Sequence, residues 1–232
     1  MRNERRPLHA STLRAVLFDV DGTLVDSNDA HAHAWEDVFR EEGYAARFAD
    51  VRPLIGMGGD KLLPKAIGVD ADSERGKALG ERRKEIFKQR YLPRLRPFPG
   101  ARALLERLRA AGLTLVVATS AQEDELAGLL DAAGVADLFA ETTSSSDADS
   151  SKPDPDIIRA ALKRAGPGVA PSAALMVGDT PYDVEAASRA GVGTVAVRSG
   201  GWDDAALRGA VAVFADVADI LARYDASPFG HT

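Results

Sequence analysis

Short apolar segments that alternate with amphipathic helical segments are the feature that most constrains how this chain can fold. The apolar runs are nearly continuous, as expected for parallel strands that helices cover on both faces. Strands are expected at 14–20, 113–119, 137–143, 174–179 and 193–198. Helices, each ending in a glycine suited to a helix C-terminus, are expected at 100–112, 122–134, 155–166 and 181–191. This order predicts the α/β class, with a Rossmann-like, doubly wound parallel sheet.

The segment between the first two expected strands breaks this alternation. It shows helical periodicity and no convincing strand, with helices expected at 29–43 and 72–92. A series of prolines then marks the return of the chain to the sheet. We therefore expect an all-helical cap domain at 27–97, inserted as a lid into a core domain made of residues 1–26 and 98–232.

The composition of the 232-residue chain removes several classes of function. It contains no cysteine, which excludes disulfides, thiolate metal sites and cysteine nucleophiles. A formal net charge of −6 argues against nucleic acid as the main ligand, since such a surface needs concentrated Lys and Arg. No apolar stretch is long enough to span a membrane, and the basic first residues lead into no secretory signal. We expect a cytoplasmic protein, monomeric by default.

Polar residues gather where the expected strands end. Ligands of open α/β sheets bind outside the carboxyl ends of the strands, so these residues are candidates for a site. Several carboxylates that point together would repel and raise one another's pKa, a conflict that a divalent cation removes. An all-oxygen site without His or Cys suits Mg²⁺. In chain order the candidates are Asp19, Asp21, Thr119, Ser120, Lys152, Asp179 and Asp183.

Phosphate chemistry is compatible with this set of residues. Hydroxyls, backbone N–H groups and a lysine can hold a phosphate dianion. One aspartate can attack phosphorus, and a second carboxylate can protonate the leaving oxygen and later activate water. Taken singly, each motif also has a purely structural interpretation: a turn at Asp21 and Gly22, a helix cap at Thr119 and Ser120, a solvated Lys152, and a first-turn helix carboxylate at Asp183.

A family resemblance rests on four segments in order: "DVDGTLVDS" (19–27), "VVATSA" (116–121), "SKPDPDI" (151–157) and "GDTPYDVEAA" (178–187). On these segments the chain resembles haloacid dehalogenase (HAD) superfamily hydrolases with a helical, C1-type cap, of the phosphoglycolate phosphatase and β-phosphoglucomutase kind. The resemblance covers nearly the whole chain beyond residue 13. It implies a Mg²⁺-dependent phosphatase that hydrolyses small phosphorylated metabolites, phosphoglycolate-like or sugar-phosphate-like, through an aspartyl-phosphate intermediate.

The resemblance also implies a role for each matching residue, starting with the catalytic ones. Asp19 would be the nucleophile and a metal ligand. Asp21 would be the general acid and base, and its backbone carbonyl would also bind the metal. Lys152 would neutralise charge on the phosphate and on Asp19.

The remaining matching residues would bind the phosphoryl group and the metal. Thr119 and the backbone at Ser120 would hold the phosphoryl group. Asp179 would be a metal ligand, and Asp183 would support the site through a metal-bound water. The resemblance therefore implies Mg²⁺ as the cofactor and a small phosphorylated metabolite as the partner.

The cap contributes weaker candidates for substrate binding. His31 closely follows the expected hinge and is a candidate to face the cleft, with a surface position as the alternative. The glycine-rich segment 55–61 follows no strand and is not a P-loop. Its Gly58 and Lys61 are expected to meet the substrate, unless the segment is an ordinary helix connection. The basic run 81–90 is interpreted as the solvated face of a cap helix.

A sugar-phosphate mutase similar to β-phosphoglucomutase is the alternative function. These mutases share the helical cap, a histidine near the hinge as at His31, and the segment 151–157. They favour a Glu-Asp pair where this chain has Gly178 and Asp179, a departure that favours hydrolysis. Phosphonoacetaldehyde hydrolases and haloacid dehalogenases rank lower because they lack the second aspartate, here Asp21. A non-catalytic binding module is the remaining alternative.

Overall fold

A six-stranded parallel sheet forms the centre of the computed structural model, which describes residues 13–139 and 141–230. The strand order β3-β2-β1-β4-β5-β6 has β1 in the middle, so the chain winds outward from it in both directions. The strands are β1 (Ala15–Phe18), β2 (Thr114–Ala118), β3 (Glu141–Thr143), β4 (Ala174–Gly178), β5 (Gly193–Val197) and β6 (Ala212–Phe214). The predicted Rossmann-like α/β class is confirmed, although the core range at 1–12 and 231–232 lies outside the described residues.

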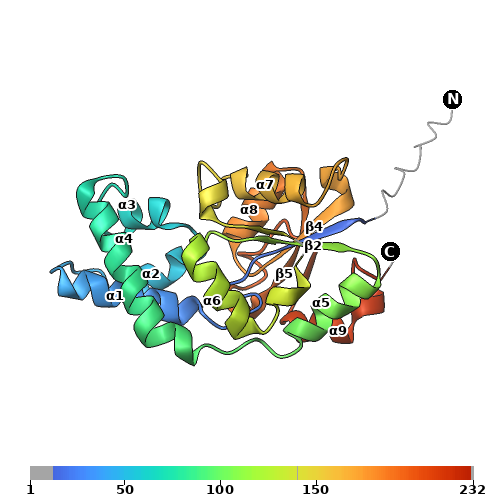
Figure 1. Cartoon of the computed structure of the whole chain (residues 1–232), viewed down its shortest axis with the longest axis horizontal. Helices are drawn as coiled ribbons and strands as arrows, with labels where there is room; N and C mark the ends of the chain where they lie inside the picture. The colour runs from blue at the N-terminus through green and yellow to red at the C-terminus, as the bar shows by residue number, and fades with distance from the viewer. Residues whose placement is uncertain (1–12, 140, 231–232) are drawn as a thin grey trace.

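Helices cover both faces of the sheet, as Figure 1 shows. Successive residues of a strand point to opposite faces. Accordingly, Val16 and Phe18 belong to the apolar cluster that includes α5, α6 and α9, whereas Ala15 and Leu17 belong to the cluster with α7 and α8. All four side chains are fully buried. The helices are α5 (Ala101–Ala110), α6 (Glu123–Ala133), α7 (Asp156–Arg164), α8 (Pro181–Arg189) and α9 (Val217–Ala222).

Two parts of the sheet differ from the sequence prediction. Of the strand expected at 137–143, only Glu141–Thr143 form β3, and Ala136–Leu138 form a 3₁₀ turn instead; residue 140 lies outside the described residues. There the Phe139 ring packs edge-on against Phe18, with 6.1 Å between ring centroids. Apolar residues therefore cap the core here instead of extending β3. The edge strand β6 was not predicted, since three residues are too few to show a period.

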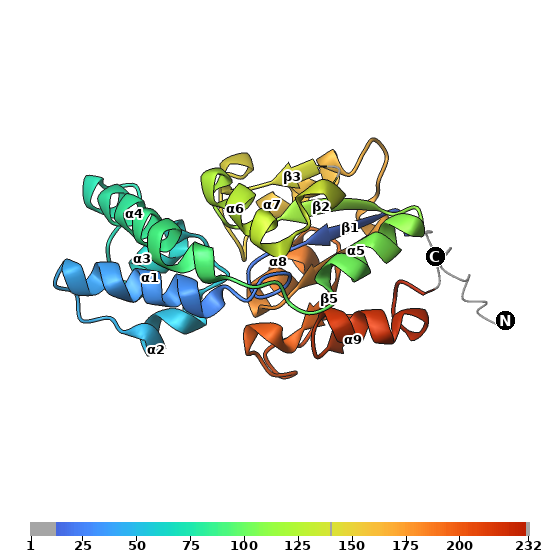
Figure 2. The same ribbon diagram turned by 60° about the horizontal axis from the view of Figure 1, so that its bottom comes forward.

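The segment inserted after β1 is helical throughout, and Figure 2 shows it as a separate group of helices beside the sheet. No strand is formed between residues 28 and 97, all of which the structure describes. The predicted helices are present, but the second continues through a π-helical turn at Phe87–Tyr91, and α2 and α3 were not predicted. The cap helices are α1 (Asn28–Glu41), α2 (Phe48–Val51), α3 (Gly59–Ile67) and α4 (Glu74–Ile86).

The chain enters and leaves the cap along two paired segments beside the end of β1. Val25 and Pro97 form an antiparallel bridge. The Asp26 N–H donates to the Arg96 carbonyl at 3.0 Å, and the Phe98 N–H donates to the Leu24 carbonyl at 2.9 Å. These bonds fasten the base of the cap to the edge of the sheet where the strand ends carry the candidate residues.

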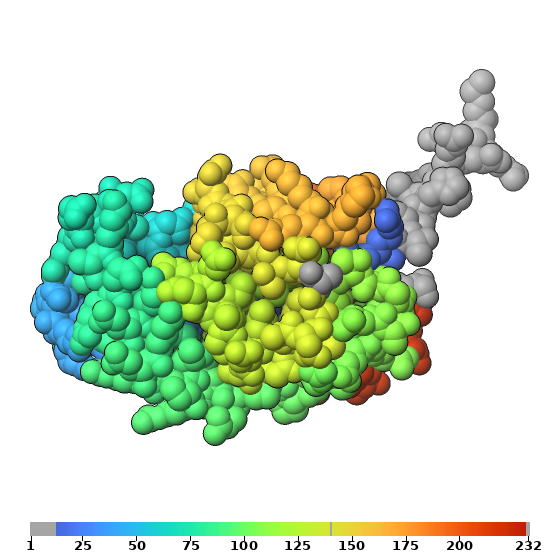
Figure 3. Space-filling model, viewed as in Figure 1, coloured from blue at the N-terminus to red at the C-terminus, as the bar shows by residue number. Residues whose placement is uncertain are grey.

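The cap also contacts the core away from this connection, and Figure 3 shows the teal cap helices lying against the core surface. Arg52 donates to the Gly200 carbonyl at 2.7 Å, and the Tyr182 hydroxyl donates to the Pro53 carbonyl at 2.6 Å. The cap therefore covers the carboxyl ends of the strands. Among the described residues, no helix combines the length and apolar character needed to cross a membrane.

Candidate active site

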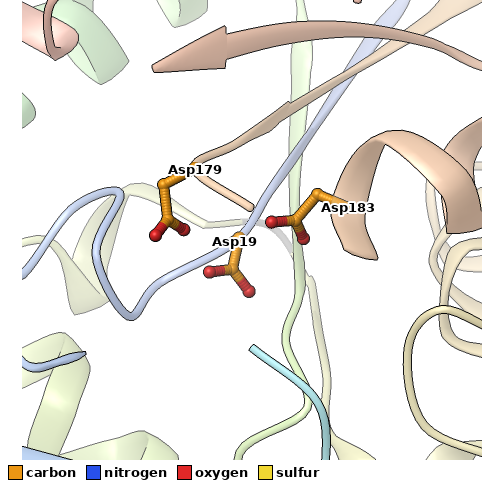
Figure 4. A group of neighbouring side chains, drawn as sticks. All are labelled: Asp19, Asp179 and Asp183. Atoms are coloured by element: carbon orange, nitrogen blue, oxygen red, sulfur yellow. The ribbon is translucent and has the colours of Figure 1, made fainter. Parts of the chain in front are cut away.

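Three carboxylates converge at the carboxyl ends of the central strands. Phe18 in β1 is in register with Val177 in β4, so Asp19 and Asp179 follow neighbouring strands at nearly the same level. Asp183 joins them from the first turn of α8. One oxygen from each residue lies within 4.8 Å of the others, and all three residues are buried. Figure 4 shows the three side chains gathered around one space.

Asp179 sits in a tight cradle that sequence reasoning did not identify. The Thr23 hydroxyl donates to Asp179 Oδ1 at 3.1 Å, and Asn28 Nδ2 donates to Oδ2 at 2.8 Å. Two glycines allow this approach: a Cβ would lie 2.2 Å from Asp179 Oδ2 at Gly22, where φ is +74°, and 1.9 Å at Gly200. Burial, followed by the charge of Asp183, raises the pKa of Asp179 to about 7.

Asp183 is fixed by the capping box of α8. The Thr180 hydroxyl accepts the Asp183 N–H at 3.2 Å, and Asp183 Oδ2 accepts the Thr180 N–H at 3.0 Å. This cap leaves Asp183 Oδ1 facing Lys152 Nζ at 2.6 Å. The Asp183 side chain therefore both caps α8 and belongs to the acidic cluster.

Lys152 is a fully buried cation between two of these carboxylates. Its Nζ lies 2.6 Å from Asp19 Oδ1 as well as from Asp183 Oδ1. Burial alone would lower the pKa of Lys152, but the charges of Asp183 and Asp19 outweigh burial and hold that pKa above its usual value. Burial also raises the pKa of Asp19 well above its usual value, although Lys152 opposes this shift. With all three carboxyl groups ionised, the cluster would carry two negative charges more than Lys152 compensates.

A hard divalent cation fits this cluster. The donors are carboxylate oxygens, the cluster is buried, and its excess charge matches that of Mg²⁺. The Asp21 carboxylate is not part of the group, so only its backbone carbonyl remains as a potential ligand from that residue. Asp19, Asp179 and Asp183 are thus the described side chains that could hold or support a metal.

The Asp21 carboxylate points to the cap instead of the acidic cluster. Its Oδ1 accepts a hydrogen bond from the Ser27 hydroxyl at 2.5 Å and lies 2.7 Å from His31 Nε2. Burial alone would raise the pKa of Asp21, but His31 and Ser27 outweigh burial and lower it. The two aspartates of the first motif therefore face different surroundings. Of the two positions considered for His31, the structure shows the one at the cavity.

A chain of side chains links Asp21 to the core through the cap. His31 Nδ1 is hydrogen-bonded to the Arg83 guanidinium, whose Nη1 bonds both oxygens of Glu125 at 2.6 and 2.7 Å. A guanidinium can only donate, so Nδ1 is the acceptor of this bond, and Nε2 is the ring nitrogen that faces Asp21. The His31 ring stacks on Phe87, with 4.1 Å between ring centroids.

Arg83 corrects one interpretation made from the sequence. It belongs to the basic run 81–90, which was interpreted as a solvated face, yet only 11% of its side chain is exposed. Its partner Glu125 is 2% exposed and comes from α6 of the core. In the sequence, the position of Glu125 on the apolar face of its helix was the indication that it has a buried, charged partner.

The cavity between cap and core has a volume of about 380 Å³ and reaches the strand ends. Asp19, Asp21, Thr119 and Ser120 all line it. The Thr119 hydroxyl accepts the Ala121 N–H at 3.1 Å, whereas the buried Ser120 hydroxyl has no hydrogen-bond partner. A buried, unpaired hydroxyl beside the nucleophile candidate is suited to an anion that enters the cavity.

The two candidates in the glycine-rich cap segment have different positions. Gly58 lines the cavity, and its N–H donates to Ser151 Oγ at 3.0 Å, so a Cβ here would lie 2.6 Å from the Ser151 side chain. Lys61 instead forms an ion pair with Asp154 and is not among the described residues that line the cavity. The structure therefore brings Gly58 to the cavity and directs Lys61 to a contact between cap and core.

Comparison with known proteins gives a consistent result. The family model for haloacid dehalogenase-like hydrolases matches residues 16–197. Two proteins named phosphoglycolate phosphatase are similar: one from Caulobacter vibrioides is 34% identical over 197 residues, covering 83% of this chain and 82% of the relative. One from Rhodospirillum rubrum is 36% identical over 217 residues, covering 89% of each.

A solved structure supports the same assignment. A hydrolase from Pseudomonas syringae superposes with a TM-score of 0.83 at 30% sequence identity, covering 92% of this chain and 98% of that one. The region matched by the family model runs from within β1 to the end of β5 and includes the strand ends that carry the acidic cluster. On this combination of sequence, fold and site, the chain belongs to the haloacid dehalogenase-like hydrolases and is a phosphoric monoester hydrolase of that superfamily.

Proposed function

We propose that the protein is a Mg²⁺-dependent phosphatase that hydrolyses small phosphorylated metabolites through an aspartyl-phosphate on Asp19. The observation that carries this proposal is the position of Asp19, which lies in the acidic cluster, contacts Lys152 and lines the cavity. The relatives named phosphoglycolate phosphatase support a small phosphate ester as substrate. We expect the enzyme to act as a monomer in the cytoplasm.

The proposed metal ligands are Asp19, Asp179 and the backbone carbonyl of Asp21, with Asp183 in support. When bound there, Mg²⁺ would neutralise charge on the phosphate and on the cluster. Lys152 holds Asp19 Oδ1, which leaves Oδ2 to attack phosphorus. Thr119 and the backbone N–H of Ser120 would receive the phosphoryl oxygens, and the unpaired Ser120 hydroxyl is a further donor.

Asp21 would transfer the protons. It would first protonate the leaving oxygen and then accept a proton from the water that attacks the aspartyl-phosphate. Its lowered pKa suits the role of proton acceptor. The negative charge of a bound phosphate would raise this pKa, which suits the role of proton donor to the leaving oxygen. His31, held at Nδ1 by Arg83, would orient the Asp21 carboxylate through Nε2.

A β-phosphoglucomutase-like mutase is the second candidate, favoured by the contact between His31 and Asp21. The local geometry at Gly178 favours hydrolysis, because a Cβ there would lie 2.5 Å from the Asp183 carboxyl carbon. The Glu-Asp pair that the resemblance associates with mutases would therefore require Asp183 to move. We accordingly place hydrolysis first.

Substitution of the two aspartates of the first motif tests the mechanism. We expect Asp19→Asn to abolish Mg²⁺-dependent phosphate release, because the nucleophile is lost. Asp21→Asn should lower kcat by about 10²- to 10⁴-fold, the usual contribution of general acid–base catalysis. Asp26→Asn, at an exposed residue of the same segment, is the matched control. Phosphatase activity that persists in pure Asp19→Asn protein would contradict the proposal.

The metal site can be tested without any activity measurement. The pKa of Asp179 is raised from 3.8 in the unfolded chain to about 7 in the folded protein. This difference lowers the stability of the folded protein progressively as the pH rises from about 4 to about 7. Without metal at pH 8, Asp179→Asn should therefore melt several degrees above the wild type, and the gap should close toward pH 4. The asparagine can still accept from Asn28 and donate to Thr23.

The same thermal melts give the response to Mg²⁺. Adding MgCl₂ at pH 8 should raise the Tm of the wild type and raise that of Asp179→Asn far less, because a ligand that binds only the folded state stabilises it. Equal stabilisation of both proteins by MgCl₂ would show that Asp179 does not hold the metal.

Product analysis separates the two candidate functions. With sugar phosphates and Mg²⁺, we expect inorganic phosphate to appear in proportion to the ester consumed, because water is the final acceptor. Released phosphate and sugar-phosphate isomers should be measured in the same reaction. If β-glucose 1-phosphate instead became the 6-phosphate without net phosphate release, the mutase would be the correct function.

The link from Asp21 to Glu125 predicts an effect of Arg83 on turnover. Arg83→Gln removes the charged donor to His31 and the contact of Nη1 with both Glu125 oxygens, so kcat should fall by roughly 10- to 100-fold as Asp21 loses its fixed orientation. Arg82→Gln, at the neighbouring arginine that pairs with Glu41, should leave kcat unchanged. Equal kcat values for the two variants, measured by phosphate release, would exclude the link.

A further inference from the structure

The cavity continues from the acidic cluster into the interior of the cap. The residues that line this part come from α1, α3, α4 and the turn before α4, and we call it the cap arm. It is formed mainly by apolar and small residues: Trp35, Leu62, Leu63, Ala71, Gly76 and Gly80. Trp35 and the two leucines are buried members of the main apolar cluster. Any group that fills the cap arm meets an aromatic ring and aliphatic side chains.

Gly80 gives the clearest sign that the cap arm is kept open. It lies in the middle of α4, where glycine destabilises a helix relative to alanine. The other cavity-lining glycine of α4 has a structural reason, since a Cβ at Gly76 would lie 2.2 Å from the Asp70 carbonyl oxygen. A Cβ at Gly80 would meet no atom within 4 Å. Packing therefore does not require Gly80, and its effect is to leave space beside the cavity.

The charges around the cavity disfavour a second anion on the substrate. Of the described residues that line it, the basic ones are His31, Lys77 and Arg83. Arg83 is bound to Glu125 and His31, and Lys77 is exposed to solvent. Acidic side chains also line this region: Asp60, Asp72, Glu81, Glu125 and Asp149. A carboxylate or second phosphate on the leaving group would find no free buried cation among these residues.

From this combination we infer that the cap arm binds the leaving group of the substrate, and that this group is an uncharged alcohol with an apolar face, larger than a two-carbon acid. The inference rests on the proposed phosphatase function and narrows its substrate class. The apolar body would pack against Trp35 and α3, and Gly80 would provide the space for it. Phosphoglycolate, whose leaving group is small and anionic, would then be a poor substrate.

Four esters of primary alcohols test the inference: ethyl phosphate, 2-phosphoglycolate, benzyl phosphate and 4-carboxybenzyl phosphate. They vary size and charge separately. We expect kcat/KM for benzyl phosphate to exceed the values for ethyl phosphate and phosphoglycolate by at least about tenfold, since an apolar pocket discriminates by such factors. The added carboxylate should lower kcat/KM for the benzyl ester by a similar factor.

Variants of α4 connect this preference to the cap arm. Gly80→Leu should lower kcat/KM for benzyl phosphate at least about tenfold more than that for ethyl phosphate, because only the larger ester needs the space. Gly80→Ala should preserve or raise the Tm, which checks that the helix tolerates a side chain here. Ala78→Leu, at an exposed residue of the same helix, is the matched control and should change neither ester.

The outcomes separate this inference from the proposed function. A preference for phosphoglycolate over benzyl phosphate, or an equal loss on both esters in Gly80→Leu, would overturn the inference and leave the phosphatase intact. Hydrolysis of p-nitrophenyl phosphate that requires Mg²⁺ and Asp19 establishes the phosphatase independently. If that hydrolysis is absent, the proposed function and the inference both fail.

Discussion

The burial of three carboxylates against one lysine is the constraint on which the rest of the structure depends. Asp19, Asp179 and Asp183 lie within ligand distance of one another, and Lys152 compensates only one of their charges. Such a cluster is costly unless each oxygen has a partner. The surrounding fold supplies several of these partners: the capping box of α8 holds Asp183, and donors from the loop after β1 and from the start of α1 hold Asp179. The remaining imbalance is what a divalent cation would compensate.

The two aspartates of the first motif divide the site between core and cap. Asp19 faces the core cluster, where burial raises its pKa, whereas Asp21 faces the cap, where His31 and Ser27 lower its pKa. An attacking carboxylate and a proton-transferring carboxylate need different surroundings, and the turn at Gly22 sends the chain from one to the other. Because His31 reaches Glu125 through Arg83, the surroundings of Asp21 depend on the cap lying against the core. In the proposed mechanism, the orientation of Asp21 for proton transfer would therefore depend on the contact between cap and core.

The sequence predicted the strand-end residues well because parallel strands share a register. The carboxyl ends of parallel strands lie at one edge of a sheet, so the polar residues at these ends were expected to gather there. The structure brings Asp19, Thr119 and Asp179 to that edge. Residues that reach the site from cap helices could not be found this way. Helical periodicity shows which side of a helix is apolar, but it does not show which other element that side packs against. Arg83 illustrates the limit, because in sequence it is one of several basic residues of α4, and its burial depends on how the cap lies on the core.

Glycines shape this site as strongly as charged residues do, and their effect also depends on tertiary contacts that the sequence does not reveal. At Gly178 and Gly200 a single added carbon would lie within 2.5 Å of a carboxylate, so any larger residue would displace Asp183 or Asp179. A glutamate at Gly178 would also bring a fourth carboxylate to a cluster whose negative charge already exceeds that of Lys152 by two. To accommodate it, the chain would have to move Asp183 away from Lys152 and from the capping box of α8. The packing of the acidic cluster therefore requires glycine at position 178, where the mutases have glutamate. A Gly178→Glu substitution alone would not reproduce the mutase arrangement.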